Sequence, residues 1–184
     1  RTALLVGPDG AKRLSDACVA VVGLGGVGSV AAEMVVRAGV GHLVILDCDR
    51  VSDTNRNRQI PALSSTVGRL KTEVVAERLK DINPELDLTV VDEYLDSGNV
   101  GVLSGFHIDY LIDAIDTLSP KLALICHCVG NHIPLVSSMG SGAKYDVTRI
   151  RITDISKSFN CPLAYIVRKK LRKMGITKGL SVSP

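Results

Sequence analysis

The sequence predicts an α/β fold: a doubly wound, mostly parallel sheet with helices on both faces and an antiparallel strand late in the chain. Three observations support it. Of the 184 residues, 46% are hydrophobic but only 3% are aromatic, which fits an aliphatic sheet covered by helices better than a sandwich. Strand-like and helical patterns alternate up to about residue 140, as in consecutive βαβ units. A glycine-rich turn also joins the first apolar run to a helix.

The elements can be taken in order along one domain, residues 1–184, because this length suits a single sizeable core. A short helix is expected near Ala11. Short apolar runs predict buried strands at 18–22, 42–46, 86–91, 110–112 and 134–138. Helical patterns predict helices at 29–37, 68–82, 118–130 and 162–174. Polar and apolar residues alternate over 149–153, which predicts a half-exposed strand, whereas 54–65 fits neither period.

The turn after the first strand has glycines at positions 23, 25 and 28, the spacing of a dinucleotide-binding loop. Gly23 permits a tight turn, Gly25 lets the backbone approach a phosphate, and Gly28 permits close packing of helix on strand. The N-terminus of the following helix directs free N–H groups and its positive dipole end at an anion. Any strand–turn–helix corner can use such glycines, but their place after a β-branched run favours a nucleotide site.

Charged residues follow the predicted strands. Asp47 comes 24 residues after Gly23, where a Rossmann-like fold places a carboxylate on ribose hydroxyls. Arg58 and Lys71 are cations that suit a triphosphate better than a pyrophosphate. Asp116 comes at the carboxyl end of a strand, where a carboxylate could hold Mg²⁺.

Five elements in register carry a family resemblance. They are Gly23-Leu24-Gly25-Gly26-Val27-Gly28, Asp47-x-Asp49-x-Val51, Asn55-x-x-Arg58-Gln59, Lys71 and Asp116. Together they resemble the adenylating enzymes related to the ubiquitin activators and to the molybdopterin- and thiamine-pathway adenylyltransferases. The resemblance implies an ATP-dependent enzyme that forms an acyl-adenylate.

The same resemblance implies roles for single residues. Asp47 would bind the ribose of ATP, and Arg58 and Lys71 would bind the phosphates and act in catalysis. Asn55 would assist them, and Asp116 would also act in catalysis, by serving Mg²⁺ and the α-phosphate. The glycines of the loop, Gly23, Gly25, Gly26 and Gly28, would line the nucleotide.

The resemblance also implies an assembly. Members of the superfamily are typically homodimers in which an arginine near the N-terminus reaches the ATP of the partner. Arg1, six residues before Gly7, matches that position and would bind the cofactor in trans.

Within the superfamily, the chain looks similar to the tRNA threonylcarbamoyladenosine dehydratases. Segments 57–60, 64–73, 112–116, 133–136 and 152–157 are close to the pattern of that group. The resemblance implies that the carboxylate of threonylcarbamoyladenosine in tRNA is adenylated and then cyclised, with release of AMP and pyrophosphate. Two positions depart from the pattern, Val147 and Cys161, where the group has proline and aspartate. Members usually continue beyond the equivalent of Pro184, so we expect further residues in the family domain.

A basic helix supports the tRNA interpretation. Its cations are Arg168, Lys169, Lys170, Arg172 and Lys173. They could contact tRNA phosphates or form only a solvated face, and the net charge of +3 is too small to decide. A second hypothesis keeps the adenylation but changes the substrate to the C-terminal glycine of a ubiquitin-like or sulfur-carrier protein. A nicotinamide-dependent dehydrogenase and a non-catalytic nucleotide-binding scaffold are further alternatives, and a sulfur-relay partner protein is left open.

The five cysteines form no paired framework, so a reducing, cytoplasmic compartment is expected. The sequence shows neither a signal peptide nor a membrane-spanning run, so no membrane partner is expected. Cys48, between two aspartates, could be a nucleophile, but the apolar run that leads up to it in the sequence favours a buried structural thiol. Neither the cysteines, including Cys161, nor the four histidines have the spacing of a zinc site, so no zinc is predicted.

Overall fold

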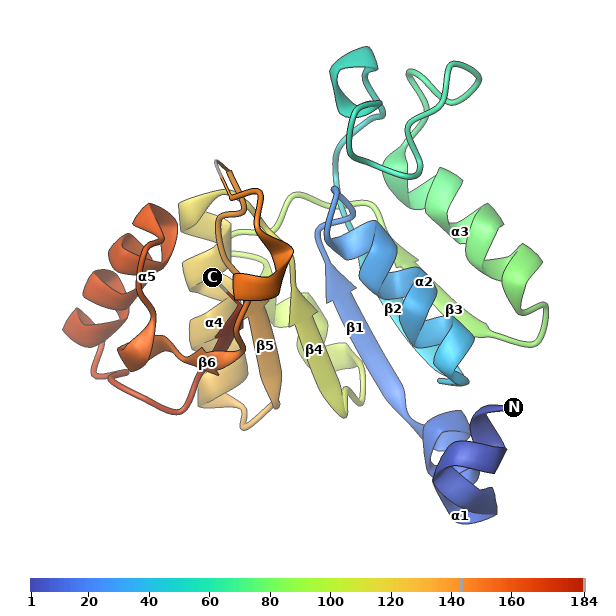
Figure 1. Cartoon of the computed structure of the whole chain (residues 1–184), viewed down its shortest axis with the longest axis horizontal. Coiled ribbons are helices and arrows are strands. Elements are labelled where there is room, and N and C mark those ends of the chain that lie inside the picture. Colours follow the sequence, from blue (N-terminus) through green and yellow to red (C-terminus); the bar gives the residue numbers. More distant parts are fainter. Residues whose placement is uncertain (143, 184) are drawn as a thin grey trace. The chain divides into compact units, whose positions relative to one another are not determined.

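The computed structural model of the chain describes residues 1–142 and 144–183. These residues form a seven-stranded sheet in the order β3-β2-β1-β4-β5-β7-β6 (Figure 1). The strands are β1 (Cys18–Val22), β2 (His42–Leu46), β3 (Asp87–Val91), β4 (Tyr110–Asp113), β5 (Leu135–Ser138), β6 (Thr153–Asp154) and β7 (Ser181–Ser183). Pairs β1–β2, β2–β3 and β5–β7 are parallel, and β6–β7 is antiparallel. The fold class predicted from the sequence is therefore confirmed, including the late antiparallel strand.

The contacts divide the chain into two compact units. The first unit comprises residues 1–94 and 107–111, and the second comprises residues 95–106 and 112–184. The α-helices are α1 (Thr2–Asp16), α2 (Gly28–Ala38) and α3 (Lys71–Ile82) in the first unit, and α4 (Leu118–Gly130) and α5 (Pro162–Lys173) in the second. Whether the two units act as one adenylating domain stays a prediction.

The core of the first unit is built on β1 and β2. Each strand is four-fifths buried, because only its first residue, Cys18 or His42, has a more accessible side chain. Helix α2 packs against β1 and α3 against β3, and the two helices contact each other (Figure 1). Val74, Val75 and Leu79 form the buried apolar stripe of α3, at the helical spacing expected from the sequence.

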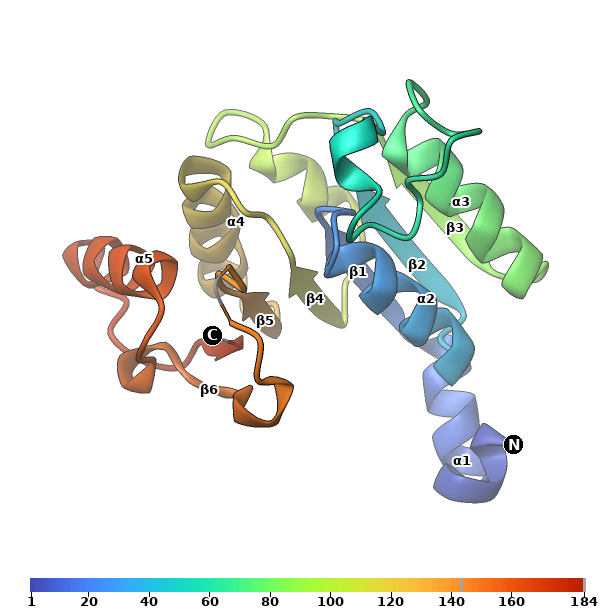
Figure 2. The ribbon, with the colours of Figure 1, turned by 45° about the horizontal axis from the view of Figure 1, so that its top comes forward.

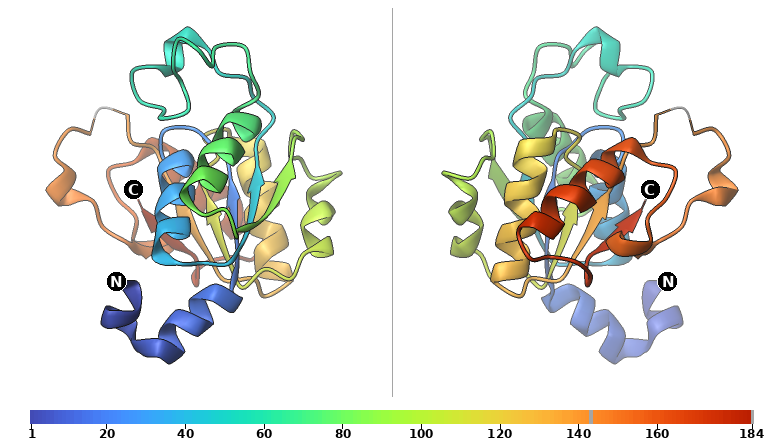
Figure 3. Two further views of the ribbon diagram at one scale, coloured as in Figure 1. Left: turned by 90° about the vertical axis from the view of Figure 1, so that its right-hand side faces the viewer. Right: turned by 90° about the vertical axis from the view of Figure 1, so that its left-hand side faces the viewer.

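Helix α1 is longer than the short helix expected near Ala11. It spans Thr2–Asp16 but contains a kink, because Gly7 has a φ of 74° and Pro8 follows it. No residue of α1 is buried. Figure 3 shows α1 at the N-terminal end of the first unit. Leu4 and Leu5 on this helix are 90% and 87% exposed, so they form a hydrophobic surface.

The second unit packs α4 against β5 and α5 (Figure 3). Ala164, Val167 and Leu171 form the buried stripe of α5. The thiol of Cys161 begins this helix, since Sγ accepts a hydrogen bond from the amide of Ala164 at 3.4 Å. A buried capping residue is therefore the structural role of this cysteine.

The predicted strand at 149–153 is wrong except for its last residue. Val147–Arg149 forms a short 3-10 turn, and only Thr153 and Asp154 join the sheet. The carboxylate of Asp146 begins the turn by accepting hydrogen bonds from the amide and the hydroxyl of Thr148, at 3.1 and 2.6 Å. Ile150 and Ile152 are both exposed, so the alternation of polar and apolar residues over 149–153 does not correspond to a strand with one buried face. In the described part of the chain, no helix has the length and apolar character needed to cross a membrane.

Candidate nucleotide site

The site begins where β1 and β2 end together. Val22 pairs with Leu46 in the parallel register, so the next residues, Gly23 and Asp47, leave the sheet at the same edge. Gly23 has a φ of 90°, and its amide donates a hydrogen bond to the carbonyl of Leu46 at 2.8 Å. A left-handed conformation of this kind is what glycine permits, as the sequence predicted for the tight turn.

The carboxylate of Asp47 is fixed by two backbone amides. Oδ2 accepts a hydrogen bond from the amide of Leu24 in the glycine loop at 2.6 Å. Oδ1 accepts one from the amide of Asp49 at 2.7 Å. Because each oxygen has further lone pairs, the oriented carboxylate can still accept hydrogen bonds from a ribose.

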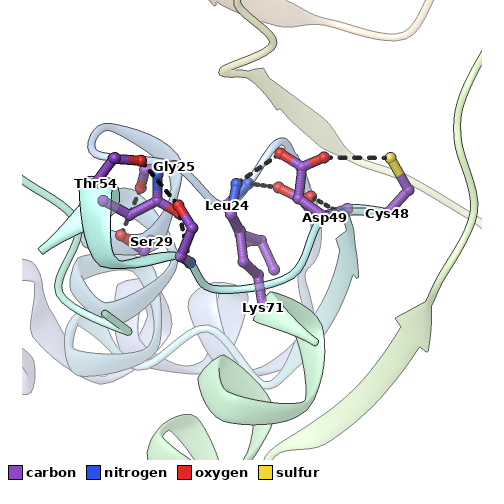
Figure 4. Close-up of polar contacts among 10 residues, drawn as sticks. Leu24, Gly25, Ser29, Cys48, Asp49, Thr54 and Lys71 are labelled. Carbon is purple, nitrogen blue, oxygen red and sulfur yellow. Dashed lines mark hydrogen bonds and ion pairs between the residues drawn. The ribbon is translucent and has the colours of Figure 1, made fainter. Parts of the chain in front are cut away.

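The glycine loop leads into the N-terminus of α2. Ser29 anchors the first turn, since its hydroxyl donates to the carbonyl of Gly25 at 2.6 Å (Figure 4). Among the described residues, no side chain caps the start of this helix at Val27. The amide of Ser29 donates to the carbonyl of Gly25 at 3.2 Å, but because no described side chain caps this end of α2, the positive end of the helix dipole is open to an anion.

A second segment lies against the glycine loop. A Cβ atom placed on Gly26 would be 3.2 Å from the carbonyl oxygen of Arg58, and one on Gly25 would be 3.7 Å from Nε2 of Gln59. From the sequence, the small size of Gly25 was attributed to the approach of a phosphate. At Gly26 the structure gives a different reason, which is the close approach of the polar segment that carries Arg58.

Asn55 organises this polar segment. Its side-chain oxygen accepts a hydrogen bond from the amide of Ser52 at 3.1 Å, and its carbonyl accepts from the amides of Arg58 and Gln59. The guanidinium of Arg58 is exposed and donates to the carbonyl of Thr54 and to Oδ1 of Asn57, at 3.1 and 2.9 Å. The bonded acceptors are neutral, so the positive charge of Arg58 stays available to a phosphate.

Lys71 is held by Asp49. Its Nζ lies 2.7 Å from Oδ2 of Asp49, and its amide donates to the carbonyl of the same residue at 2.9 Å (Figure 4). The side chain of Lys71 is only 6% exposed, whereas that of Asp49 is 63% exposed. No role was predicted for Asp49 from the sequence, where it was only a member of the motif Asp47-x-Asp49-x-Val51. Its position two residues after Asp47 was the feature that could have indicated a role in the site.

Cys48 is exposed, so the expectation of a buried structural thiol is wrong. The physical reason is that β2 ends at Leu46, and Cys48 lies beyond the buried strand. Partial desolvation of the sulfur, followed by the nearby charges of Asp49 and Asp47, raises the pKa of its thiol. A thiol with a raised pKa is mostly protonated at neutral pH and is a poor nucleophile.

The predicted residues are shared between the two units. Arg1, the glycine loop, Asp47, Asn55, Arg58 and Lys71 belong to the first unit, and Asp116 and the basic residues of α5 belong to the second. Asp116 is exposed in the turn between β4 and α4. That it completes the nucleotide site stays a prediction, as does the role of each residue towards ATP.

On α5, four of the five predicted tRNA-contact residues are exposed, namely Lys169, Lys170, Arg172 and Lys173. Arg168 is half-buried. It donates a hydrogen bond to the carbonyl of Ser158 at 2.6 Å, and its guanidinium carbon lies 5.8 Å from the ring centroid of Tyr165. Arg168 therefore contributes to the local structure as well as to the charge of the helix.

Comparison with known proteins identifies the family. The model of the ThiF family matches residues 1–182. The tRNA threonylcarbamoyladenosine dehydratase of Bacillus subtilis is 44% identical over 182 residues, which cover 99% of this chain and 72% of the relative. The enzyme of the same name from Escherichia coli is 46% identical over 96% of this chain and 66% of the relative.

A solved structure agrees with these sequences. The crystal structure of the E. coli dehydratase in complex with ATP superposes with a TM-score of 0.96 and 43% identity, covering 99% of this chain and 78% of that one. The chain thus spans about two thirds to three quarters of the relatives it matches. It belongs to the ThiF family and, within that family, to the tRNA threonylcarbamoyladenosine dehydratases.

Proposed function

We propose that this chain is the ATP-binding part of an enzyme that dehydrates threonylcarbamoyladenosine in tRNA. The observation that carries the proposal is its likeness, over almost its whole length, to a dehydratase that has been solved with ATP. Three features at the edge of the sheet beside Gly23 and Asp47 suit a nucleotide: an oriented carboxylate, a helix N-terminus without a side-chain cap, and nearby cations.

The proposed reaction activates a carboxylate, which by itself has no usable leaving group. A carboxylate oxygen of the substrate attacks the α-phosphorus of ATP, the bond to the β-phosphate oxygen breaks, and pyrophosphate leaves. An internal nucleophile of the carbamoyl group then attacks the acyl carbon and AMP leaves as the ring closes. The net change in the nucleoside is the loss of one water.

The chain contributes position and charge to these steps. Asp47 binds the ribose hydroxyls and so fixes the nucleoside end of ATP. The N-terminus of α2, with Arg58 and Lys71, stabilises the phosphate oxygens, whose charge increases at the α-phosphate as the substrate attacks. The contact with Asp49 holds the Lys71 ammonium at one place near the start of α3.

We propose that Asp116 holds Mg²⁺ brought with ATP. In the part of the chain that the structure describes, Asp116 is exposed and its carboxylate forms no ion pair, so its oxygens fit a cation that prefers carboxylate and phosphate ligands. When bound, Mg²⁺ would neutralise phosphate charge. The fit can be measured without turnover, because Asp116→Asn should weaken Mg²⁺-dependent ATP binding but not Mg²⁺-free binding.

We also propose a cytoplasmic homodimer in which Arg1 reaches the ATP of the partner. Leu4 and Leu5 on α1 are almost fully exposed, which is unusual for adjacent leucines unless another surface covers them. A second copy would bury this surface and bring Arg1 with it. Sedimentation of the wild type and of Leu4→Asp/Leu5→Asp tests this, with an unchanged mass for the variant as the contradicting result.

The function is tested by mass spectrometry of tRNA nucleosides after incubation of the full-length protein with ATP. We expect tRNA that carries threonylcarbamoyladenosine to lose one water, with AMP formed, and tRNA without the modification to be unchanged. No loss of water would contradict the proposal. Pyrophosphate exchange stimulated by a small ubiquitin-like protein, but not by tRNA, would instead favour the protein-substrate alternative.

A further inference from the structure

The two units carry opposite formal charges. The second unit has eleven lysines and arginines against five aspartates, a formal charge of +6, whereas the whole chain has only +3. The first unit is therefore acidic, at −3. The small net charge of the whole chain therefore results from a basic unit and an acidic unit that partly cancel. Positive charge concentrated on one part of a protein is typical of proteins that bind nucleic acid.

Part of this charge lines a cavity on the second unit. The cavity has a volume of about 410 Å³, within the range of roughly 300–1,000 Å³ for small-molecule sites. It lies in the segment that leads from β5 to α5, drawn in orange in Figure 2. Its charged and aromatic lining comprises Lys144, Tyr145, Asp146, Arg149, Arg151 and Phe159, and we name it the 144–160 pocket.

Among the described residues, no carboxylate forms an ion pair with a cation of the pocket. Nζ of Lys144 donates to the carbonyl of Gly140 at 2.7 Å, and the guanidinium of Arg151 donates to the carbonyls of Thr148 and Ile150 at 2.7 and 2.9 Å. The backbone amide of Arg149 donates to the carbonyl of Asp146 at 3.2 Å, but its guanidinium has no hydrogen-bond or ion-pair partner among the described residues. Asp146, the acidic residue of the lining, uses Oδ1 to begin the turn at Thr148.

Two aromatic side chains accompany these cations. Tyr145 is 96% exposed and Phe159 is 59% exposed, although this chain contains only six phenylalanines and tyrosines. Asn160, which follows Phe159, has a φ of 51°, a conformation that asparagine tolerates better than most residues. The backbone therefore turns sharply beside Phe159, immediately before α5 begins.

We propose that the 144–160 pocket binds one unpaired nucleotide of the substrate RNA, with its base stacked on Tyr145 or Phe159 and its phosphate bound by Arg149 and Arg151. This inference rests on the proposed function, which makes RNA the substrate. Proteins recognise unpaired RNA by stacking splayed bases on aromatic rings while cations follow the backbone. The pocket combines both groups within one segment.

The charges favour RNA over a second copy of the chain. A symmetric contact between two copies would bring the same patch against itself, so Lys144, Arg149 and Arg151 would meet like charges. A polyanion instead gains from all three cations. If the pocket were instead found to form a symmetric contact between two copies of the chain, that result would overturn the proposal.

The test uses the full-length protein, a tRNA anticodon stem-loop with 2-aminopurine in the loop, and a fully paired RNA of equal length. We expect the wild type to quench the fluorescence of the loop base by stacking. Tyr145→Ala/Phe159→Ala should abolish this quenching and weaken stem-loop binding about 5- to 150-fold, the range for removal of a base-stacking aromatic. Binding of the paired RNA should barely change.

Two further variants separate stacking from charge. Arg149→Ala should weaken binding and reduce the slope of log K against log salt by about 0.7, the value for one phosphate contact on a single strand. Tyr94→Ala, at an exposed tyrosine of the first unit, is the matched control and should leave quenching intact. Circular dichroism and ATP affinity confirm that each variant is folded.

The outcomes are distinguishable. A wild type that neither binds nor dehydrates tRNA contradicts the proposed function itself. A wild type that does both, with pocket variants that quench and bind like it, overturns only the pocket. Loss of dimers in the Tyr145→Ala/Phe159→Ala variant with unchanged RNA binding also overturns it, because the pocket would then be a contact between copies.

Discussion

The ammonium of Lys121 lies 2.7 Å from the carboxylate of Asp113, and both side chains are completely buried. The hydroxyl of Ser137 donates to the same carboxylate oxygen at 2.5 Å. The other oxygen accepts from the amide of Ile115 at 3.0 Å, so the carboxylate fixes the turn between β4 and α4. Asp116 directly follows Ile115 in that turn, which links a buried ion pair to the residue proposed to hold Mg²⁺.

We expect Lys121→Met to destabilise the protein by about 3–5 kcal/mol, since it leaves the Asp113 charge buried without its cation. The double variant Lys121→Met/Asp113→Leu should recover much of this loss, because it removes both charges. Lys12→Met is the matched control, at an ion pair with Asp16 that is largely exposed, and should cost at most about 1 kcal/mol. Urea unfolding measures all three, and equal losses for Lys121→Met and Lys12→Met would contradict the prediction.

Gly26 tests the contact between the glycine loop and the polar segment. In Gly26→Ala the new Cβ would lie 3.2 Å from the carbonyl of Arg58, so the segment that carries Arg58 must shift. We expect slower adenylation, by about tenfold or more because small displacements of a catalytic group are costly, with little loss of stability. Gly130→Ala, whose Cβ would meet nothing within 4 Å, is the control. Turnover of Gly26→Ala at the wild-type rate would show that the position of Arg58 does not matter.

A substitution of Asp47 should change both ATP affinity and the stability of the ligand-free protein, because its carboxylate also accepts two backbone hydrogen bonds. We expect Asp47→Ala to weaken ATP binding by roughly 1.5–3 kcal/mol, the scale of a charged hydrogen bond. Because the amides of Leu24 and Asp49 also lose their acceptor, the ligand-free protein should be destabilised as well, by roughly 1 kcal/mol. Calorimetry with ATP and a thermal melt without it measure the two effects. Unchanged ATP affinity would contradict the ribose assignment.

The parts that the sequence predicted well depend on local patterns. The strand ending at Val22, the glycine turn and the strand ending at Leu46 follow from apolar runs and glycine chemistry, and a parallel register then brings Gly23 and Asp47 to one edge. The helix from Leu118 to Gly130 was predicted with the bounds that the structure has. Here local propensity and tertiary packing favour the same conformation.

The parts that the sequence missed depend on long-range contacts. The strand Ser181–Ser183 is only three residues long and exists because β5 and β6 pair with it. The contact of Arg58 with Gly26 and the ion pair of Asp49 with Lys71 join segments about 20 to 30 residues apart. Hydrophobic periodicity describes only local structure and cannot predict such contacts. The strand expected at 149–153 failed because the Asp146 side chain satisfies the backbone locally and begins a turn instead.

The charges around Cys48 allow a last prediction. Partial desolvation and the carboxylates of Asp49 and Asp47 raise the pKa of its thiol, so at a given pH the thiolate fraction is smaller than in a free cysteine. Alkylation of exposed Cys48 by iodoacetamide should therefore be slow at pH 8 and should increase only at a pH above the usual range for a thiol.

Removing one of these charges should shift the pH dependence of Cys48 alkylation in a known direction. Asp49→Asn takes away a negative charge that opposes the thiolate, so the pKa of Cys48 should fall and alkylation at pH 8 should become faster. Asp53→Asn, at an exposed aspartate of the same loop, provides the control and should leave the rate unchanged. Mass spectrometry of the Cys48 peptide over a pH series gives both rates. If Asp49→Asn slowed alkylation or left it unchanged, the carboxylate would not be what suppresses the thiolate.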